Sequence, residues 1–199
     1  MTLRRTNLKT RRTMSRQIVL ASGSPRRKSL LEDLGIEIDV RVSDADEVSD
    51  GAPLEVVEQN ARVKCRAIAQ NASPNEIVIA ADTIVVHEGA ILGKPTSLDE
   101  AGSMLRKLSG DTHEVMTGVE FWNGATDRYV SKVETTRVTF RELAPREIAR
   151  FVEIVQPLDR AGAYTVDGPG SLLVARYEGC FYNVLGLPLN LVHEILLGM

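Results

Sequence analysis

Hydrophobic and polar residues follow two different periods along this chain, and each change of period marks a new element. Residues 17–21 (QIVLA) form an uninterrupted apolar run, which is typical of a buried strand. Residues 26–35 (RRKSLLEDLG) then place three leucines on one helical face, and a glycine ends the pattern. A Ser-Gly-Ser-Pro turn lies between the two segments. The first apolar segment therefore predicts a strand, a turn and a helix in succession.

The next hundred residues repeat this succession. Residues 36–42 alternate like a half-buried strand, and residues 53–72 carry apolar side chains at helical spacing. Residues 76–93 predict a central strand that reaches Asp82, runs on through an apolar stretch and turns back at Glu88-Gly89. Strands thus alternate with helices, as in α/β proteins.

The C-terminal half predicts a capped helix, a hairpin and two further helices. Ser97 followed three residues later by Glu100 has the spacing of a capping box. The remaining predicted elements are a hairpin of residues 112–123 and 128–140 around Asn123-Gly124, a helix at 144–155, a Gly/Pro-rich loop at 157–171 and a closing helix near 187–197. We expect one compact α/β domain over residues 15–199, with a mixed central sheet flanked by helices.

Charge separates a basic tail from an acidic body. Residues 1–16 carry six cations and no acid, which leaves 18 cations against 27 acids in the remaining chain. An Arg-rich tail is compatible with a targeting peptide or a nucleic-acid arm. However, the sequence from Met14 (MSRQIVLASGSP) resembles a natural start, so we expect residues 1–14 to be a disordered extension.

Composition also excludes several classes of protein. An acidic body lacks the broad basic face that nucleic-acid binding requires. No apolar run approaches the roughly 20 residues of a membrane span, so we expect a soluble protein without a membrane partner. Cys65 and Cys180 have no metal-ligand spacing and are too few for a disulfide scaffold, which fits a reducing cytoplasm.

The turn and helix start at residues 21–28 (ASGSPRRK) have two interpretations. A Ser/Gly-rich turn before a helix directs unpaired backbone N–H groups at one spot and suits a phosphate, which would also explain why Arg26 and Arg27 stand at the positive end of a helix. Alternatively, Ser24 caps the helix, Pro25 occupies its first position and the cations are solvated.

Two further residues suggest chemistry at a phosphate. Asp82 follows the apolar run IVIAA at the expected carboxyl end of a central strand, where α/β sheets bind ligands, although strand-end aspartates also cap turns. Residues 89–96 (GAILGKPT) lack the spacing of a P-loop, but Lys94 between glycine and proline is well placed as a point charge.

Other polar residues give weaker signals. Asp44, Asp46 and Glu47 offer metal-binding oxygens, or form an ordinary solvated acidic loop. The three histidines show no zinc spacing, and no nucleophile elbow or Cys/His arrangement is present, so covalent catalysis is not expected.

Four segments taken together resemble the Maf family of nucleotide pyrophosphatases: LASGSPRRKSLLEDLG, ADTIVV with GAILGKP, EAGSMLRKLSGDTHEVMTGV, and DRAGAYTVDGPG with GLPL. They run in order from about residue 17 to the end. The resemblance implies an elongated, two-lobed fold similar to inosine triphosphate pyrophosphatases and a cytoplasmic homodimer. It also implies Mg²⁺- or Mn²⁺-dependent hydrolysis of a nucleoside triphosphate to a monophosphate and pyrophosphate, in nucleotide-pool sanitation and the arrest of cell division.

The resemblance also implies roles for particular residues. Asp82 matches the proton acceptor, with Glu47 as its metal-binding partner, and Lys94 joins them at the reaction centre. The implied phosphate-binding residues are Ser22, Arg27, Lys64 and Lys94, and Ser24 in the same turn is a further candidate for substrate binding. Carboxylates with a metal and several cations are the parts that hydrolysis at the α phosphorus requires.

Base preference is implied by three positions. Arg26 and Thr83 match the subgroup that acts on dTTP and UTP. Asp167 stands where that subgroup has glutamine and where the subgroup acting on 7-methyl-GTP has glutamate. A carboxylate only accepts hydrogen bonds whereas glutamine also donates, so modified nucleotides are the alternative substrates. The alternative to an enzyme is a regulator of septum formation that binds a nucleotide or a protein without turnover.

Overall fold

The structure is a computed structural model that describes residues 16–199. The predicted extension at residues 1–14 lies outside the described residues. The strands are β1 Gln17–Leu20, β2 Ile38–Val40, β3 Glu76–His87, β4 Ala90–Leu92, β5 Thr112–Asn123, β6 Arg128–Phe140 and β7 Val174–Glu178. The helices are α1 Pro25–Asp33, α2 Pro53–Ala69, α3 Leu98–Leu108, α4 Pro145–Val155, α5 Phe181–Val184 and α6 Leu189–Leu197, with 3₁₀ turns η1 Ala161–Ala163 and η2 Gly168–Leu172.

All seven strands join one mixed sheet. Their order is β2-β1-β3-β5-β6-β7, and β4 pairs with β3 off this path. β1 lies parallel to β2 and β3, and the remaining pairs are antiparallel. The predicted α/β class with a mixed central sheet is confirmed, as is the hairpin of β5 and β6, whose bounds match those predicted.

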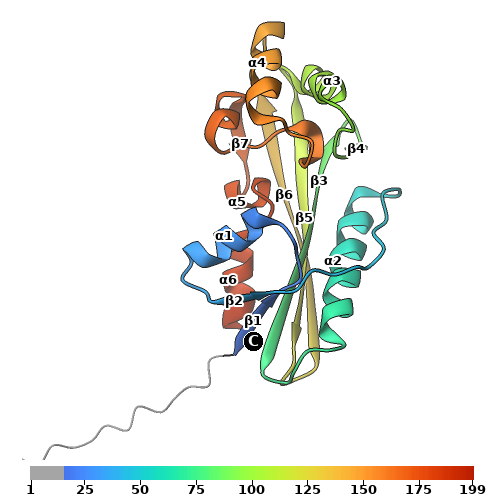
Figure 1. Ribbon diagram of the computed structural model, residues 1–199, viewed down its shortest axis with the longest axis vertical. Coiled ribbons are helices and arrows are strands. Elements are labelled where there is room, and N and C mark those ends of the chain that lie inside the picture. The colour runs from blue at the N-terminus through green and yellow to red at the C-terminus, as the bar shows by residue number, and fades with distance from the viewer. Residues whose placement is uncertain (1–15) are drawn as a thin grey trace, which may run out of the picture.

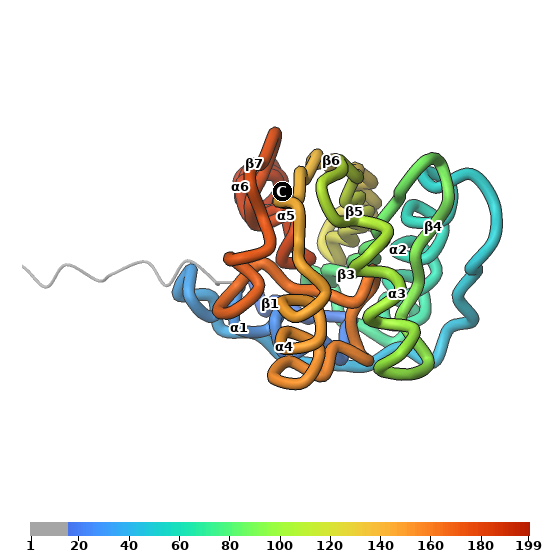
Figure 2. Tube along the Cα trace, turned by 90° about the horizontal axis from the view of Figure 1, so that it is seen from above, coloured from blue at the N-terminus to red at the C-terminus, as the bar shows by residue number. Residues whose placement is uncertain are grey.

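Helices cover both faces of the sheet (Figures 1 and 2). α2 packs on one face, where Cys65 and Ala69 contact Val78, Ala80 and Trp122. α1 and α6 pack on the opposite face, against the alternate residues of β3 and β5. α3 and α4 enclose a further core at the far end of the long strands, so the molecule is elongated (Figure 1). One core region thus lies at this end of the sheet, and the other lies beneath α1, α2 and α6.

The structure corrects the prediction for the strand that carries Asp82. That residue does not lie at a strand end, because β3 continues to His87 through pairing with β5. However, the parallel pairing of β3 with β1 ends at Ile79. Asp82 therefore lies three residues beyond the parallel part of the sheet, beside the open end of β1.

Three smaller differences concern local structure. The hydroxyl of Ser97 accepts from the Glu100 backbone N–H as predicted, but the Glu100 carboxylate binds Thr96, so the capping box is half formed. β7 and α5 were not predicted, because neither is long enough to establish a period. Within residues 16–199 no helix is both long enough and apolar enough to cross a bilayer.

Candidate active site

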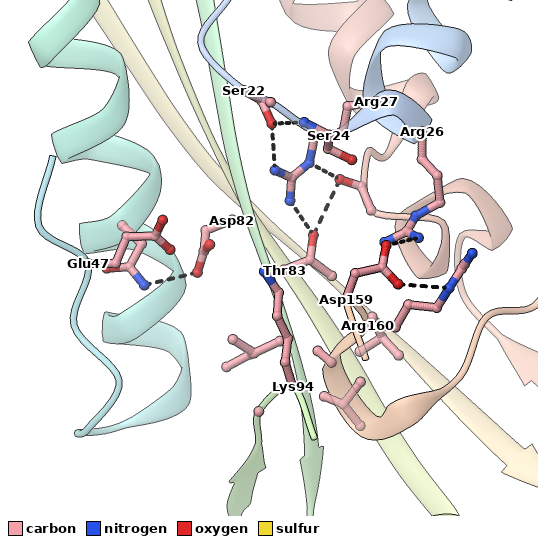
Figure 3. A pocket seen from close by; sticks show the side chains of 18 of the residues that line it. Ser22, Ser24, Arg26, Arg27, Glu47, Asp82, Thr83, Lys94, Asp159 and Arg160 are labelled. Atoms are coloured by element: carbon pink, nitrogen blue, oxygen red, sulfur yellow. Dashed lines mark hydrogen bonds and ion pairs between the residues drawn. The ribbon is translucent and has the colours of Figure 1, made fainter. Parts of the chain in front are cut away.

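A cavity of about 860 Å³ opens between the two cores and brings distant parts of the chain together (Figure 3). Its walls come from the turn before α1, the middle of β3, one face of α2, the segment after β4 and the loops around residues 160 and 185. The lining includes nine of the ten predicted site residues: Ser22, Ser24, Arg26, Arg27, Glu47, Lys64, Asp82, Thr83 and Lys94. The tenth, Asp167, is exposed and lies outside this lining.

Strand alternation explains how β3 serves two sides of the site. Successive side chains of a strand point to opposite faces. Asp82 shares its face with Val78 and Ala80, which pack under α2, whereas Thr83 shares the face of Ile79, which packs toward α1 and α6. Asp82 therefore meets residues of α2, and Thr83 meets the side chain of Arg27 from α1.

The first part of the site, which we term the carboxylate end, consists of Asp82, Glu47, Lys64 and Asn60. Nζ of Lys64 lies 2.8 Å from Oδ1 of Asp82 and 2.8 Å from Oε2 of Glu47. Asn60, one helical turn before Lys64, donates from Nδ2 to Oδ2 of Asp82 at 3.1 Å. Asp82 is buried, and both of its carboxylate oxygens are held by donors.

Asn60 also fixes the loop that carries Glu47. Its Oδ1 accepts from the Val48 backbone N–H at 2.8 Å, and its Nδ2 donates to the Val48 carbonyl at 2.9 Å. One buried amide thus connects the acidic loop, α2 and the strand that carries Asp82. No motif in the sequence singles out Asn60, which lies one helical turn before Lys64.

A glycine allows α2 to approach the sheet at this point. Gly118 on β5 is paired with Asp82. A Cβ atom at position 118 would lie 2.3 Å from the carbonyl oxygen of Val57 on α2. Any larger residue would push α2 away from the sheet, and with it the side chains of Asn60 and Lys64.

Arg27 lines the cavity, and among residues 16–199 its guanidinium is hydrogen-bonded only to neutral groups. Nε donates to the Gly186 carbonyl at 2.9 Å, Nη1 to Oγ of Ser22 at 3.1 Å, and Nη2 to Oγ1 of Thr83 at 3.0 Å (Figure 3). Burial lowers its pKa, and the charge of Asp82 partly opposes this change. A half-buried guanidinium without a bound carboxylate suits an anionic ligand.

The turn before α1 has the predicted geometry at its helix start. Pro25 occupies the first helical turn and Ser24 the N-cap position, but the Ser24 hydroxyl forms no capping hydrogen bond. Instead, Oγ of Ser22 accepts from the Ser24 backbone N–H at 3.3 Å. The first turn contains no acidic residue.

The opposite wall, which we term the arginine end, carries Arg26, Asp159 and Arg160, with Asp167 behind them. Nη1 of Arg26 lies 3.8 Å from Oδ2 of Asp159, and Nε of Arg160 lies 3.5 Å from Oδ1 of the same carboxylate. Nη1 of Arg160 lies 4.0 Å from Oδ1 of Asp167, which also accepts from the Thr165 hydroxyl. Burial, and next the charge of Arg160, lower the pKa of Arg26.

Sequence reasoning did not single out Asp159 and Arg160. Both lie in the predicted Gly/Pro-rich loop, within the DRAGAY segment that contributed to the resemblance. The available signal was an adjacent acid and base in a loop of small residues. Lys94 lies beside this loop, because the Gly162 backbone N–H donates to the Gly93 carbonyl at 3.0 Å.

Metal-binding groups are sparse in the site. Among residues 16–199 no three His, Cys, Asp or Glu side chains gather as a metal site would require, and Asp44 and Asp46 do not line the cavity. The predicted metal pair, Asp82 and Glu47, shares the ammonium of Lys64. Two carboxylates still fit Mg²⁺ or Mn²⁺, since Mg²⁺ is commonly held by one or two carboxylates together with substrate phosphates.

The charged groups of the lining have a positive balance. Five cations (Arg26, Arg27, Lys64, Lys94 and Arg160) face three carboxylates (Glu47, Asp82 and Asp159), which leaves a formal charge of +2. The chain as a whole is negative, with a formal charge of −3. The cavity therefore concentrates positive charge on an acidic protein, as expected for a site that attracts an anionic ligand.

Comparisons with known proteins identify relatives over almost the whole chain. A family model described as Maf-like protein matches residues 17–199. Proteins named dTTP/UTP pyrophosphatase from Bacillus anthracis (strain CDC 684) and Bacillus cereus (strain AH820) are each 46% identical over 183 residues, covering 90% of this chain and 94% of theirs. A solved structure of the Staphylococcus aureus Ham1 protein covers 62% of this chain and 71% of its own at 18% identity, with a TM-score of 0.45.

Proposed function

The chain belongs to the family of Maf-like proteins, and from this premise we propose that it hydrolyses dTTP and UTP to the nucleoside monophosphate and pyrophosphate. It is a nucleoside triphosphate pyrophosphatase, which cleaves the bond between the α and β phosphates. The names of its relatives support this activity. The preference for thymine and uracil is the more specific part of what we propose.

The observation that carries the proposal is the cavity itself. A buried carboxylate, Asp82, stands in a site whose lining has a formal charge of +2. A nucleoside triphosphate with four negative charges and one bound divalent cation has a net charge of −2. Site and substrate are therefore complementary in charge, with a carboxylate available at the place of reaction.

We assign the roles of general base and phosphate ligands from this geometry. Asp82 accepts the proton of the attacking water, while Lys64 and Asn60 hold its carboxylate in place at 2.8 and 3.1 Å. Arg27, Lys94 and the turn of Ser22 and Ser24 bind phosphate oxygens. These cations stabilise the charge that grows on the leaving pyrophosphate.

A divalent cation fits beside the same carboxylates. Asp82 and Glu47 would hold Mg²⁺ or Mn²⁺, which neutralises phosphate charge and acts as a Lewis acid when bound. Glu47 is suited to adjust, because its side chain is 52% exposed and it lies on a loop fixed through Val48. Lys64 then has Asp82 or a phosphate oxygen as its partner.

Release of pyrophosphate from a nucleotide panel tests this function directly. We expect release from dTTP and UTP in the presence of Mg²⁺ or Mn²⁺ and its loss when the metal is chelated. Nucleoside diphosphate or orthophosphate as the first product would contradict the proposed reaction. A matched preparation of Asp82→Asn identifies release due to a contaminating enzyme, since that release would remain.

We further propose that the protein acts in the cytoplasm as a homodimer, in nucleotide-pool sanitation and in the arrest of cell division. Both cysteines are free, which fits a reducing compartment. The alternative, a regulator of septum formation that binds nucleotide or protein without turnover, is not favoured, because the relatives are named for pyrophosphatase activity. Sedimentation at micromolar concentration tests the dimer, and a monomer throughout would contradict it.

A further inference from the structure

The arginine end contains an alternating row of charges along one wall of the cavity. Arg26, Asp159 and Arg160 follow one another at 3.8 and 3.5 Å (Figure 3). Nη1 of Arg160 also lies 4.0 Å from Oδ1 of Asp167. The first three residues line the cavity and the fourth does not. A ligand in the cavity thus meets a donor, an acceptor and a donor in this order, because arginine only donates and an ionised carboxylate only accepts.

The charged groups of this row do not satisfy all of one another's hydrogen bonds. The separations between Arg26, Asp159 and Arg160 reach or exceed the limit of a hydrogen bond. Among residues 16–199, Nε and Nη1 of Arg160 are buried and have no hydrogen-bond partner. Asp159 is open to the cavity, with 72% of its side chain exposed. The Arg160 side chain as a whole is 21% exposed and lines the cavity, where its guanidinium can donate to a ligand acceptor.

Among the common bases, only uracil and thymine present the complementary order of an acceptor, a donor and an acceptor. The Watson–Crick edge of uracil or thymine consists of a carbonyl acceptor, the N3–H donor and a second carbonyl acceptor. The edge of cytosine has two acceptors and then a donor, and that of guanine has one acceptor and then two donors. Adenine lacks a third group. Such edges are how proteins distinguish unpaired bases.

We propose that Arg26, Asp159 and Arg160 recognise the base: Asp159 accepts from N3–H of uracil or thymine, and the two arginines donate to the flanking carbonyls. This rests on the proposed function and specifies its substrate. Asp167 lies outside the cavity lining and competes with the base for Arg160 through a long ion pair. Asp159 and Arg160 become residues that determine specificity beside Arg26.

The test combines a substrate lacking the donor with a variant lacking the acceptor. UTP, N3-methyluridine triphosphate and CTP are compared as substrates of the full chain and of Asp159→Ala. The matched control is Glu153→Ala, which removes an exposed carboxylate of α4 that pairs with the exposed Arg150. The full chain and the control should prefer UTP at least about tenfold in kcat/KM over both other substrates, in the range of a well-formed base contact.

In Asp159→Ala the preference for UTP over N3-methyluridine triphosphate should fall at least about fivefold. Melting temperatures of all three proteins establish that they are folded. Equal use of UTP and its N3-methyl analogue by the full chain would overturn the proposal. So would a variant in which the rates on all three substrates fall by one common factor, since that result describes a structural role.

The proposed hydrolysis can be wrong while the proposed base recognition is right, and the two outcomes can be distinguished. If the full chain releases no pyrophosphate from any nucleotide, the hydrolytic assignment is wrong. Calorimetric binding of UTP and of its N3-methyl analogue to the same proteins then makes the same comparison without turnover. A lower affinity for the analogue in the full chain, but not in Asp159→Ala, supports base recognition, and equal affinities in the full chain reject it.

Discussion

The two ends of the cavity hold their charges in different ways. At the carboxylate end, Lys64 touches two carboxylates at 2.8 Å, and an amide donates to the second oxygen of Asp82. At the arginine end the ion pairs are 3.5 to 4.0 Å long, and two buried nitrogens of Arg160 have no hydrogen-bond partner among residues 16–199. The first arrangement is complete without a ligand, whereas the second has only long ion pairs and leaves the Asp159 carboxylate 72% exposed.

This difference matches what hydrolysis and recognition each require. A general base must be held in place before the substrate arrives, since loss of positioning costs much of the rate. A recognition surface gains specificity from groups whose hydrogen bonds are completed only by the correct ligand. We therefore expect damage to the carboxylate end to reduce turnover, and damage to the arginine end to alter affinity and base preference.

The largest effect should come from Asp82→Asn. The amide keeps the shape of the side chain and removes the charge needed in the transition state. Turnover should fall by at least about a hundredfold, the low end for a positioned acid-base group, while nucleotide still binds. The measurement pairs kcat with the melting temperature of the same preparation.

The control for this change is Asp33→Asn, an exposed carboxylate near the end of α1. It should retain full turnover. Near-normal turnover by folded Asp82→Asn would assign the general base elsewhere, with Glu47 the next candidate. A lower melting temperature with unchanged turnover per folded molecule would reduce Asp82 to a structural role.

Acidification should weaken the core behind the arginine end. His113 is buried, its Nε2 lies 2.7 Å from the Tyr164 hydroxyl, and Tyr164 lines the cavity. Burial, and next the charge of His87, lower the pKa of His113 from 6.5 to about 4. The unfolded chain therefore takes up this proton first, so the contribution to stability is present above pH 6.5 and is lost as the pH falls toward 4.

The size of this loss can be isolated with His113→Gln, which does not titrate. Between pH 7.5 and pH 5 the full chain should lose about 2 kcal/mol more of its free energy of unfolding than the variant. Denaturant titrations at both pH values measure the difference. Parallel losses in the two proteins would show that His113 titrates alike in the folded and unfolded states.

Replacing the central arginine should affect binding more than stability. Arg27→Lys keeps one charge but cannot reproduce three hydrogen bonds to Gly186, Ser22 and Thr83. We expect kcat/KM for UTP to fall at least about tenfold, mainly through KM. Arg150→Lys, at a surface pair with Glu153, is the matched control and should leave kcat/KM unchanged.

The smallest effect should come from Asp167→Gln. Asp167 is exposed and 4.0 Å from Arg160, so its influence is that of a weak ion pair. The amide frees Arg160 from a competing carboxylate, and the preference for dTTP and UTP should rise by about threefold. Ratios of kcat/KM across the nucleotide panel measure it. An unchanged ratio would remove Asp167 from base selection altogether.

Most of the fold was predictable because its long elements have clear periods. β5, β6, α2 and α4 each repeat one period over eleven residues or more, and the structure places them where the sequence did. The apolar run past Asp82 correctly indicated that β3 continues. However, its pairing with β5, which shows that Asp82 is not a strand end, could not be predicted from the local sequence. Whether a strand ends at a residue depends on which neighbour continues beside it.

The site was less predictable, for a related reason. Residues with strong local context, such as Lys94 between glycine and proline or Arg27 at a helix start, could be selected from the sequence. Asn60 could not, because its importance comes from three hydrogen bonds to two residues on other segments, Val48 and Asp82. The row at the arginine end likewise depends on the folding of one loop against α1, which no spacing in the sequence records.

We propose that water attacks the α phosphorus beside Asp82, and isotope labelling identifies the phosphorus that is attacked. Hydrolysis of dTTP in ¹⁸O-labelled water, followed by mass spectrometry of both products, locates the oxygen that enters. Attack at the α phosphorus should place one ¹⁸O atom in the thymidine monophosphate and none in the pyrophosphate. Label in the pyrophosphate would instead place the attack at the β phosphorus and rule out the proposed reaction.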